Sequence, residues 1–197
     1  MLILHFIRIR LKRFAILLRV KKMVTIVFPG RENKACAKAL CAILERFGGA
    51  VFADETEISD YAPVASQYFV CNANRLCRVP MRESVLLLTD TKHIPKMLSE
   101  MNFGRVVADS DSTPCTTENA VIVGMRKDSQ ITVSSVDSDR LQICVQKTLK
   151  TFSGKEILPC EFSVARAANT DLKTALFAFA VLLLSDKADT VTLKMKL

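Results

Sequence analysis

A short apolar run that leads straight into a helix-patterned segment is the feature that most constrains the fold of this chain. The run is Val24 to Phe28, and Pro29-Gly30 joins it to a segment that ends at Gly48-Gly49. A strand that enters a helix directly leaves backbone N–H groups unpaired at the positive end of the helix dipole, where anions bind. The connection therefore predicts an α/β fold with a candidate phosphate loop at the end of the first strand.

The loop carries two of the residues that a phosphate loop needs and lacks two others. Gly30 permits a sharp turn close to an anion, and Lys34 stands where a lysine reaches the outer phosphates. Asn33 occupies the place of a second glycine, and Ala35 the place of a magnesium-binding hydroxyl. The neighbouring Glu32 would repel a phosphate. Two interpretations follow: a weakened phosphate site formed by Gly30, Asn33 and Lys34, or an ordinary strand-to-helix turn with Lys34 in solvent.

Four further apolar runs with polar flanks predict buried parallel strands. They are residues 50–53, 67–71, 85–89 and 105–108. Residues 94–101 have the apolar spacing of an amphipathic helix. The succession of strand, helix, strand, helix and strand predicts an α/β layer with a mostly parallel sheet.

The pattern changes from Ala120 onward, where shorter runs are separated by turn residues. These runs are residues 120–123, 130–136, 141–147 and 156–164, and their alternation predicts antiparallel hairpins. A strongly apolar helix is predicted over Asp171 to Ser185, followed by an edge strand over Val191 to Leu197. We therefore expect a single α/β domain over residues 23–197, in which antiparallel strands and an apolar helix follow a mostly parallel sheet.

The net charge of +8 is concentrated in a leader, residues 1–22. The leader holds seven of the 28 basic residues and no acidic residue, which leaves 21 basic against 20 acidic residues from Met23 onward. Because the remainder is nearly neutral, we expect no nucleic-acid partner. The leader is too interrupted by charge to span a bilayer, which needs ~20 apolar residues. It is interpreted either as a peripheral membrane contact or as sequence that is not translated, with Met23 as the start.

The seven cysteines include no C-x-x-C pair, and two histidines accompany them. This spacing argues against a zinc site, and no metal site is predicted. Cys36 and Cys41 on the first helix, and Cys144 in a strand pattern, are interpreted as small buried side chains in a reducing cytoplasm. Cys115 lies in a loop rich in Ser and Thr and is the cysteine that we expect to be exposed.

Five segments form a succession that resembles a known family. Val24 to Lys34 is similar to a strand followed by a G-T-[NK]-G-K-[TS] loop, and residues 39–49 are similar to the helix and turn after it. Val106 to Asp111 is similar to a strand that ends in Asn-x-Asp-Asp, residues 120–124 to the next strand and its glycine, and residues 171–185 to an alanine-rich closing helix. Together they resemble the central, ATP-binding domain of the Mur ligases, which add amino acids to the nucleotide-linked precursor of the bacterial cell wall.

The resemblance implies a nucleotide site and its cofactors. Gly30 and Lys34 match the family's phosphate loop, Asn33 departs from it, and Asp109 and Asp111 match the loop that flanks the adenosine. ATP and Mg²⁺ are the cofactors that this resemblance implies. The segment from Thr89 to His93 has a different spacing from the family's Asp-His pair around magnesium, and the family's flanking substrate domains are absent from this sequence.

Peptide-ligase chemistry needs ATP in a complete loop, a metal that offsets charge on the phosphoryl group, and a docked amine. Because residues for two of these are missing, we predict a degenerate, non-catalytic Mur-ligase-like domain. It would bind a nucleotide or another phosphorylated ligand weakly, or a protein partner. The alternatives are a small ATP-dependent amino-acid ligase of cell-wall precursor synthesis and a membrane-surface adaptor that acts through the leader.

Overall fold

A computed structural model of the chain describes residues 23–55, 66–73, 83–89, 103–111, 119–165 and 171–189. Four sequence predictions lie outside these residues: the leader, the helix at 94–101, the exposed Cys115 and the edge strand at 191–197. Within the described ranges, every helix is too short or too polar to cross a membrane.

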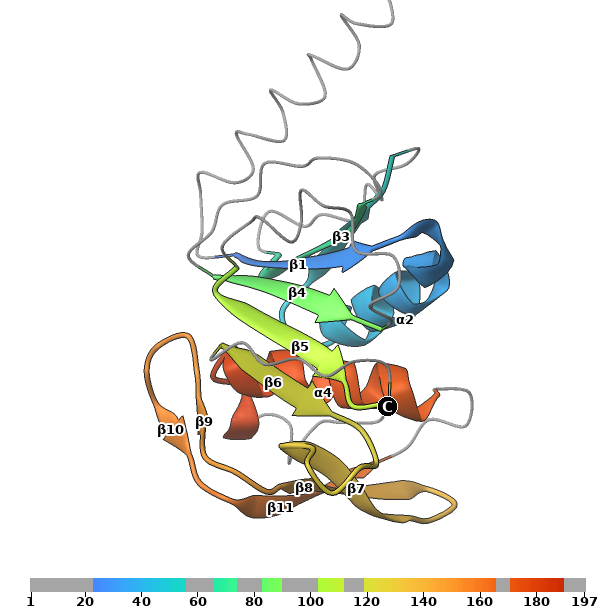
Figure 1. Ribbon diagram of the computed structural model, residues 1–197. Helices are drawn as coiled ribbons and strands as arrows, with labels where there is room; N and C mark the ends of the chain where they lie inside the picture. The colour runs from blue at the N-terminus through green and yellow to red at the C-terminus, as the bar shows by residue number, and fades with distance from the viewer. Residues whose placement is uncertain are drawn as a thin grey trace, which may run out of the picture.

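A nine-stranded sheet forms the body of the domain (Figure 1). Its strands stand in the order β11-β8-β7-β6-β5-β4-β1-β3-β2. In chain order they are β1 (Val24–Pro29), β2 (Ala50–Ala53), β3 (Tyr68–Ala73), β4 (Ser84–Leu88), β5 (Arg105–Asp109), β6 (Ala120–Val123), β7 (Ile131–Val136), β8 (Arg140–Val145) and β11 (Cys160–Ala165). A separate ribbon pairs β9 (Leu149–Lys150) with β10 (Glu156–Ile157).

The sheet is parallel from β2 to β6 and antiparallel beyond β7. Parallel pairs join β2 to β3, β3 to β1, β1 to β4, β4 to β5 and β5 to β6. Strand β7 pairs with β6 in parallel at a single position, whereas β7 with β8 and β8 with β11 are antiparallel. The predicted fold class, a mostly parallel sheet followed by antiparallel strands and an apolar helix, is therefore confirmed.

Two details of the sequence prediction are wrong. Residues 120–123 do not belong to an antiparallel hairpin, because β6 extends the parallel sheet beside β5. A short apolar run has the same pattern in either arrangement, so only the pairing decides between them. The run 156–164 forms two strands, β10 and β11, which are separated at Leu158-Pro159. Proline has no N–H to donate to a strand ladder, and this favours the break.

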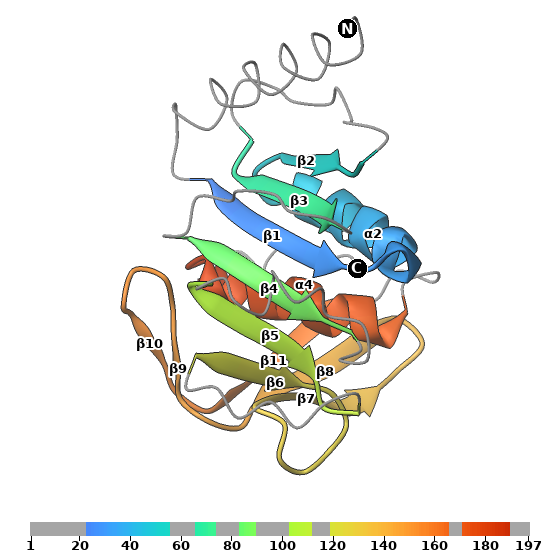
Figure 2. The ribbon, with the colours of Figure 1, turned by 45° about the horizontal axis from the view of Figure 1, so that its top comes forward.

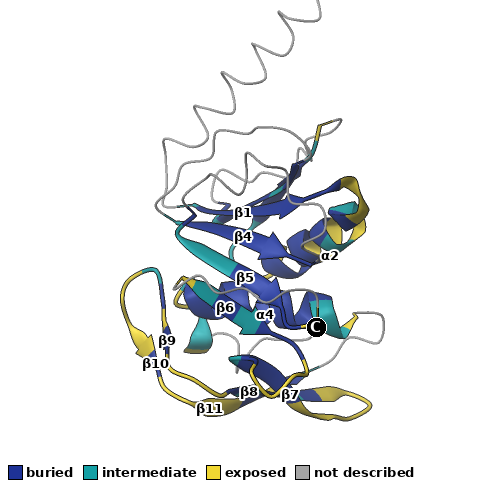
Figure 3. Cartoon of the chain, viewed as in Figure 1, coloured by how far each residue is buried: buried dark blue, intermediate teal, exposed yellow. Residues whose placement is uncertain are grey.

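Two helices, α2 (Lys34–Glu45) and α4 (Leu172–Leu184), cover the same face of the sheet (Figure 2). The ring of Phe28 in β1 meets the ring of Phe177 in α4 edge-on, with centroids 6.5 Å apart. Every residue of α4 from Thr174 to Leu184 is buried, and Figure 3 shows the middle of this helix in the colour of buried residues. Helix α4 is apolar all round because it packs against both the sheet and α2.

The strand order fixes the place where a ligand would bind. Strands β2 and β3 lie on one side of β1, and β4 lies on the other. Open α/β sheets bind ligands outside the carboxyl ends of the strands at such a reversal of strand order. The first turns of α2 and α4 are neighbours, because Cys36 Sγ and Thr174 Oγ1 are 3.4 Å apart.

Candidate functional site

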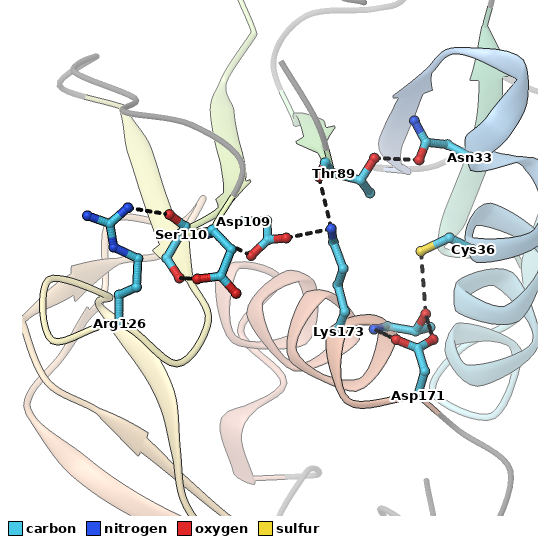
Figure 4. Close-up of polar contacts among 10 residues, drawn as sticks. Asn33, Cys36, Thr89, Asp109, Ser110, Arg126, Asp171 and Lys173 are labelled. Carbon is cyan, nitrogen blue, oxygen red and sulfur yellow. Dashed lines mark hydrogen bonds and ion pairs between the residues drawn. The ribbon is translucent and has the colours of Figure 1, made fainter. Parts of the chain in front are cut away.

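We use the term carboxyl edge for the ends of β1, β2, β4 and β5 together with the first turns of α2 and α4. A series of polar contacts runs along this edge (Figure 4). It joins Asp109 to Lys173, Lys173 to Thr89, and Thr89 to Asn33. The series therefore brings two of the predicted site residues, Asn33 and Asp109, into one constellation.

The turn after β1 is closed by buried amide side chains. Gly30 has a φ of 86°, in the left-handed region that glycine adopts at low cost, and a single 3₁₀ turn, η1 (Arg31–Asn33), leads into α2. Asn33 Nδ2 donates to Pro29 O at 2.5 Å, and Asn33 Oδ1 accepts from Thr89 Oγ1. Asn72 Nδ2 of β3 donates to Gly30 O at 2.7 Å. Asn33 thus links the turn to the end of β4. A phosphate loop has glycine at the position of Asn33, and glycine would make no such link.

The carboxylate of Glu32 lies close to the same turn. A Cβ built on Gly30 would be 2.0 Å from Glu32 Oε1, so a larger residue at position 30 would require the exposed Glu32 side chain to move. Gly30 therefore provides both the backbone conformation and the space for Glu32. A phosphate that approached the first turn of α2 would meet the negative charge of Glu32 there.

Lys34, the first residue of α2, is held by an acidic residue at the end of β2. Lys34 Nζ lies 2.6 Å from Asp54 Oδ2. The Asp54 side chain is 6% exposed and that of Lys34 is 39% exposed. Lys34 is thus both part of an ion pair and partly exposed to solvent, and its position does not decide between the two interpretations of the loop. The ammonium group is fixed beside the turn, and part of the side chain remains accessible.

Lys173 in the first turn of α4 is a second positioned cation. Its Nζ lies 2.5 Å from Asp109 Oδ2 and donates to Thr89 O at 2.9 Å. The side chain of Lys173 is 39% exposed, whereas that of Asp109 is 10% exposed. A lysine ammonium has three N–H donors, and two of them are used by these contacts. Within the described residues, the third donor of Lys173 has no partner.

The loop after β5 packs tightly against the loop after β6. Asp109 Oδ1 accepts from Asp111 N at 3.2 Å, and Ser110 N donates to Val123 O at 2.7 Å. A Cβ on Gly124 would lie 2.1 Å from Ser110 Oγ, so the close approach requires a glycine there. These contacts fix the orientation of Asp109, while the exposed Asp111 adds negative charge beside it.

The residues of the carboxyl edge do not fit the magnesium ion that the family resemblance implies. Ala35 has no hydroxyl, and both carboxylate oxygens of Asp109 already have partners, namely the ammonium of Lys173 and the N–H of Asp111. In the described part of the chain, no group of three or more His, Cys, Asp or Glu residues is placed to hold a metal. Magnesium-dependent chemistry therefore has no support from these residues.

The two cysteines of α2 are poor nucleophiles. Burial raises the pKa of the Cys36 thiol, against a smaller opposing effect of its hydrogen bond with Thr174. Burial, reinforced by the charge of Glu45, raises the pKa of Cys41 to about 11. The expectation that these cysteines are inert, largely buried side chains is in line with their positions. It does not extend to Cys160, which is exposed on β11.

Sequence reasoning missed Asp54, Thr89 and Lys173 as parts of this site. Thr89 ends a predicted strand, and Lys173 lies in the first turn of a predicted helix. Both positions are typical of a ligand-binding edge. Which edge residues meet depends on the order of the strands, and the strand order is not encoded in any local pattern.

Comparisons with known proteins find likenesses among solved structures alone. No family model matches the chain. No curated protein matches it either. Among solved structures, it is similar to a UDP-N-acetylmuramoyl-L-alanyl-D-glutamate–2,6-diaminopimelate ligase, with a TM-score of 0.48 and 10% identity, over 86% of this chain and 44% of that chain. The chain thus spans less than half the length of that ligase.

Proposed function

We propose that this chain is a non-catalytic, Mur-ligase-like domain that binds a phosphorylated small ligand, such as a nucleotide, at the carboxyl edge without magnesium. The observation that carries the proposal is the position of Lys173. Its ammonium is anchored by Asp109 and by Thr89 O, and it retains a donor for a ligand.

The two helices add to the positive potential at this edge. Helices α2 and α4 begin side by side there, as the contact between Cys36 and Thr174 requires. Each helix N-terminus carries a partial positive charge that favours a phosphate. In α4 part of this charge is already met by Asp171, whose Oδ1 accepts from Thr174 N at 3.0 Å, so the first turn of α2 contributes more. Lys34 and Lys173, each 39% exposed, lie in the first turns of these helices.

The same geometry accounts for weak binding. Each of the two lysines is paired with an aspartate, so a phosphate must share the ammonium with an internal carboxylate. Glu32 adds a further negative charge beside the Gly30 turn. Ion pairs at partly exposed positions contribute little individually, and the ligand therefore gains only a small net free energy from each lysine.

The absence of turnover follows from the chemistry of phosphoryl transfer. Transfer of a phosphoryl group requires neutralisation of the charge that develops on its oxygens, usually by a metal ion. Ala35 supplies no metal ligand, and the carboxylate of Asp109 is occupied by Lys173. The ligand would be bound and released unchanged.

The test is a calorimetric titration of the full chain with ADP and with inorganic pyrophosphate in EDTA. We expect saturable binding of both, weakened at least fivefold by Lys173→Ala. Lys155→Ala removes an exposed lysine from the turn between β9 and β10 and should leave both affinities unchanged.

Loss of Lys173 alone leaves the largely buried Asp109 without its lysine partner, so a double variant is needed. Lys173→Ala with Asp109→Asn removes both charges and should fold while still losing the affinity. Equal affinities of the wild type and this double variant would overturn the proposal, as would an equal loss in Lys155→Ala, since that result would indicate nonspecific attraction by charge.

A further inference from the structure

The two outermost strands of the nine-stranded sheet differ in how far they are covered. Strand β2 ends the sheet on one side, and each of its four residues is between 3% and 7% exposed. Strand β11 ends it on the other side, at the lower margin of the sheet in Figure 1, and Cys160, Glu161 and Ser163 in this strand are exposed. Within the described ranges, β11 pairs with β8 alone.

The backbone hydrogen bonds of β8 show which of its residues point toward β7. Asp137 N donates to Arg140 O, and Gln146 N donates to Gln130 O, both at 2.8 Å. Successive residues of a strand direct their backbone N–H and C=O groups to opposite sides. The even-numbered residues of β8 therefore point toward β7, and the odd-numbered residues point toward β11.

The same alternation identifies the outward-pointing backbone groups of β11. Ile143 of β8 lies opposite Phe162 of β11, and the two strands pair without interruption over six positions. Because Ile143 points toward β11, Phe162 points back toward β8. The N–H and C=O groups of Glu161, Ser163 and Ala165 then point away from β8, along the free side of the strand.

Strand β11 lacks the features by which natural edge strands avoid further pairing. Such strands usually carry lysine, proline or a bulge. The six residues of β11 include neither lysine nor proline, and their pairing with β8 has no bulge. Pro159, directly before the strand, has no N–H to donate, so an added strand would pair with the residues after it. A regular, exposed edge of this kind accepts one more strand.

The sequence of β11 is complementary to itself in one antiparallel register. With Ser163 opposite Ser163 of a second copy, Glu161 of each chain lies opposite Ala165 of the other. All three of these residues point outward, so each of the three pairs exchanges two backbone hydrogen bonds. The two Glu161 carboxylates are then about 14 Å apart along the strands, which exceeds the Debye length of ~8–10 Å. No like charges meet in this register.

The side chains on the helix-covered face agree with the same register. The ring of Phe162 meets the ring of Phe179 in α4, with centroids 5.1 Å apart, so Phe162 lies on the face that the helices cover. In the register centred on Ser163, Phe162 is opposite Val164 of the second copy, and the apolar layer continues across the contact. A register centred on Phe162 would instead place Ala165 opposite Pro159, which cannot donate a hydrogen bond.

We propose that the chain forms a two-fold symmetric dimer in which β11 pairs with β11 of a second copy and joins the two sheets. A two-fold contact uses the same surface on both chains, as the self-complementary register requires. One strand pair is small beside the roughly 1,600 Å² of a standard interface, so we expect a dissociation constant on the order of 100 μM. This contact is independent of the carboxyl edge and of the ligand proposed there.

The experiment is sedimentation equilibrium of the full chain from about 10 μM to about 1 mM, a range that brackets the expected dissociation constant. Amide hydrogen exchange is measured at both ends of this range. We expect a monomer–dimer equilibrium, and slower exchange at high concentration for the amides of Glu161, Ser163 and Ala165. The amide of Phe162 points toward β8 and should exchange at the same rate throughout. A monomer at every concentration would overturn the proposal.

Two substitutions at Ser163 locate the contact. Ser163→Pro removes an outward N–H and should weaken dimerisation at least tenfold, while the β8 ladder is retained. Ser163→Ala is the matched control, because both variants lose the hydrogen bond from Gln142 Nε2 to Ser163 Oγ at 3.2 Å. This control keeps the N–H and should dimerise as the wild type does. A dimer that persists in Ser163→Pro would place the contact elsewhere and contradict the proposal.

The exchange measurement on the wild type decides the question even where the proline variant fails to fold. A dimer through β11 must slow exchange at Ser163 as the concentration rises. Dimerisation with unchanged exchange at this amide would overturn the proposal.

Discussion

Asn33 occupies the position at which a phosphate loop has glycine, and its side chain is engaged inside the fold. Its amide bridges Pro29 O and the hydroxyl of Thr89. The sequence is sufficient to predict that Gly30 and Lys34 lie at the end of the first strand, because the pattern of strand, glycine and helix is local. It does not predict that Asn33 meets Thr89 or that Lys34 meets Asp54, because the partners lie on strands whose order is set by the whole sheet.

Glu32 limits the affinity for phosphate at this turn. Its carboxylate lies against Gly30, and removal of the charge in Glu32→Gln keeps the size of the side chain. Removal of a like charge at an exposed position is worth about 0.5–1 kcal/mol, so we expect the affinity for pyrophosphate to rise about two- to fivefold. Glu45→Gln, at the far end of α2, should leave it unchanged. An unchanged affinity in Glu32→Gln would show that the carboxylate does not compete with the ligand.

Cys41 makes the stability of the domain sensitive to alkaline pH. Its pKa is raised from 9.0 to about 11, so the folded state favours the protonated thiol more strongly than the unfolded state does. This stability is fully present below pH 9 and is lost as the pH rises toward 11, up to about 2–3 kcal/mol for a shift of this size. Urea unfolding at several pH values between 8 and 11 should show a smaller decline in Cys41→Ala than in the wild type. An equal decline in the free energy of unfolding of the wild type and of Cys41→Ala would contradict the assignment of this pH dependence to Cys41.

At the scale of elements, the turn from β1 to α2 is held to β3 and to the end of β4 by the side chains of Asn72 and Asn33. Its predicted elements are confirmed, since β1 and α2 occupy the residues that the pattern indicated. The burial of α4 from Thr174 to Leu184 was less predictable in its partners, because the sequence predicts a strongly apolar helix but not that α2 packs against it as well as the sheet. The parallel pairing of β6 was missed for a similar reason, namely that a four-residue apolar run does not specify its neighbour.

Substitution of Asn33 by glycine should destabilise this turn. Asn33→Gly removes two buried hydrogen bonds, each of which stabilises the fold by about 1 kcal/mol. Glycine also loses more backbone entropy on folding, which costs a further ~0.5–1 kcal/mol. We therefore expect a loss of about 2–3 kcal/mol in the free energy of unfolding, measured in urea. Asn119→Gly, in the exposed turn before β6, serves as the control and should cost less than half as much.

The same change combined with Ala35→Thr rebuilds the family's loop residues. Because both oxygens of Asp109 remain engaged, the double variant should gain no magnesium-dependent affinity for ATP. A gain of tenfold or more in the presence of Mg²⁺ would mean that the rest of the metal site is intact, contrary to the arrangement of Asp109 and Lys173.

At the scale of the whole molecule, the strand order separates two edges with different chemistry. The carboxyl edge gathers the first turns of two helices and two lysines, each paired with an aspartate, and it is the edge at which we propose that a phosphorylated ligand binds. The opposite edge, at the amino ends of β1, β3 and β4, instead adjoins the C-terminal end of α4 and a cavity whose lining includes Glu83, Asp186 and Lys187. Composition does not reveal this difference between the two edges, because the basic and acidic residues from Met23 onward nearly balance.

The most direct test of a non-catalytic, metal-independent site is the affinity of the full chain for ATP in EDTA compared with its affinity in excess Mg²⁺, together with an assay for released phosphate. We predict saturable binding of ATP, with dissociation constants that differ by less than threefold between EDTA and excess Mg²⁺. We also predict that phosphate is released no faster than in buffer without the protein. Binding that tightens tenfold or more with Mg²⁺, accompanied by phosphate release that Lys173→Ala abolishes, would contradict the account and identify the chain as an active phosphoryl-transfer enzyme.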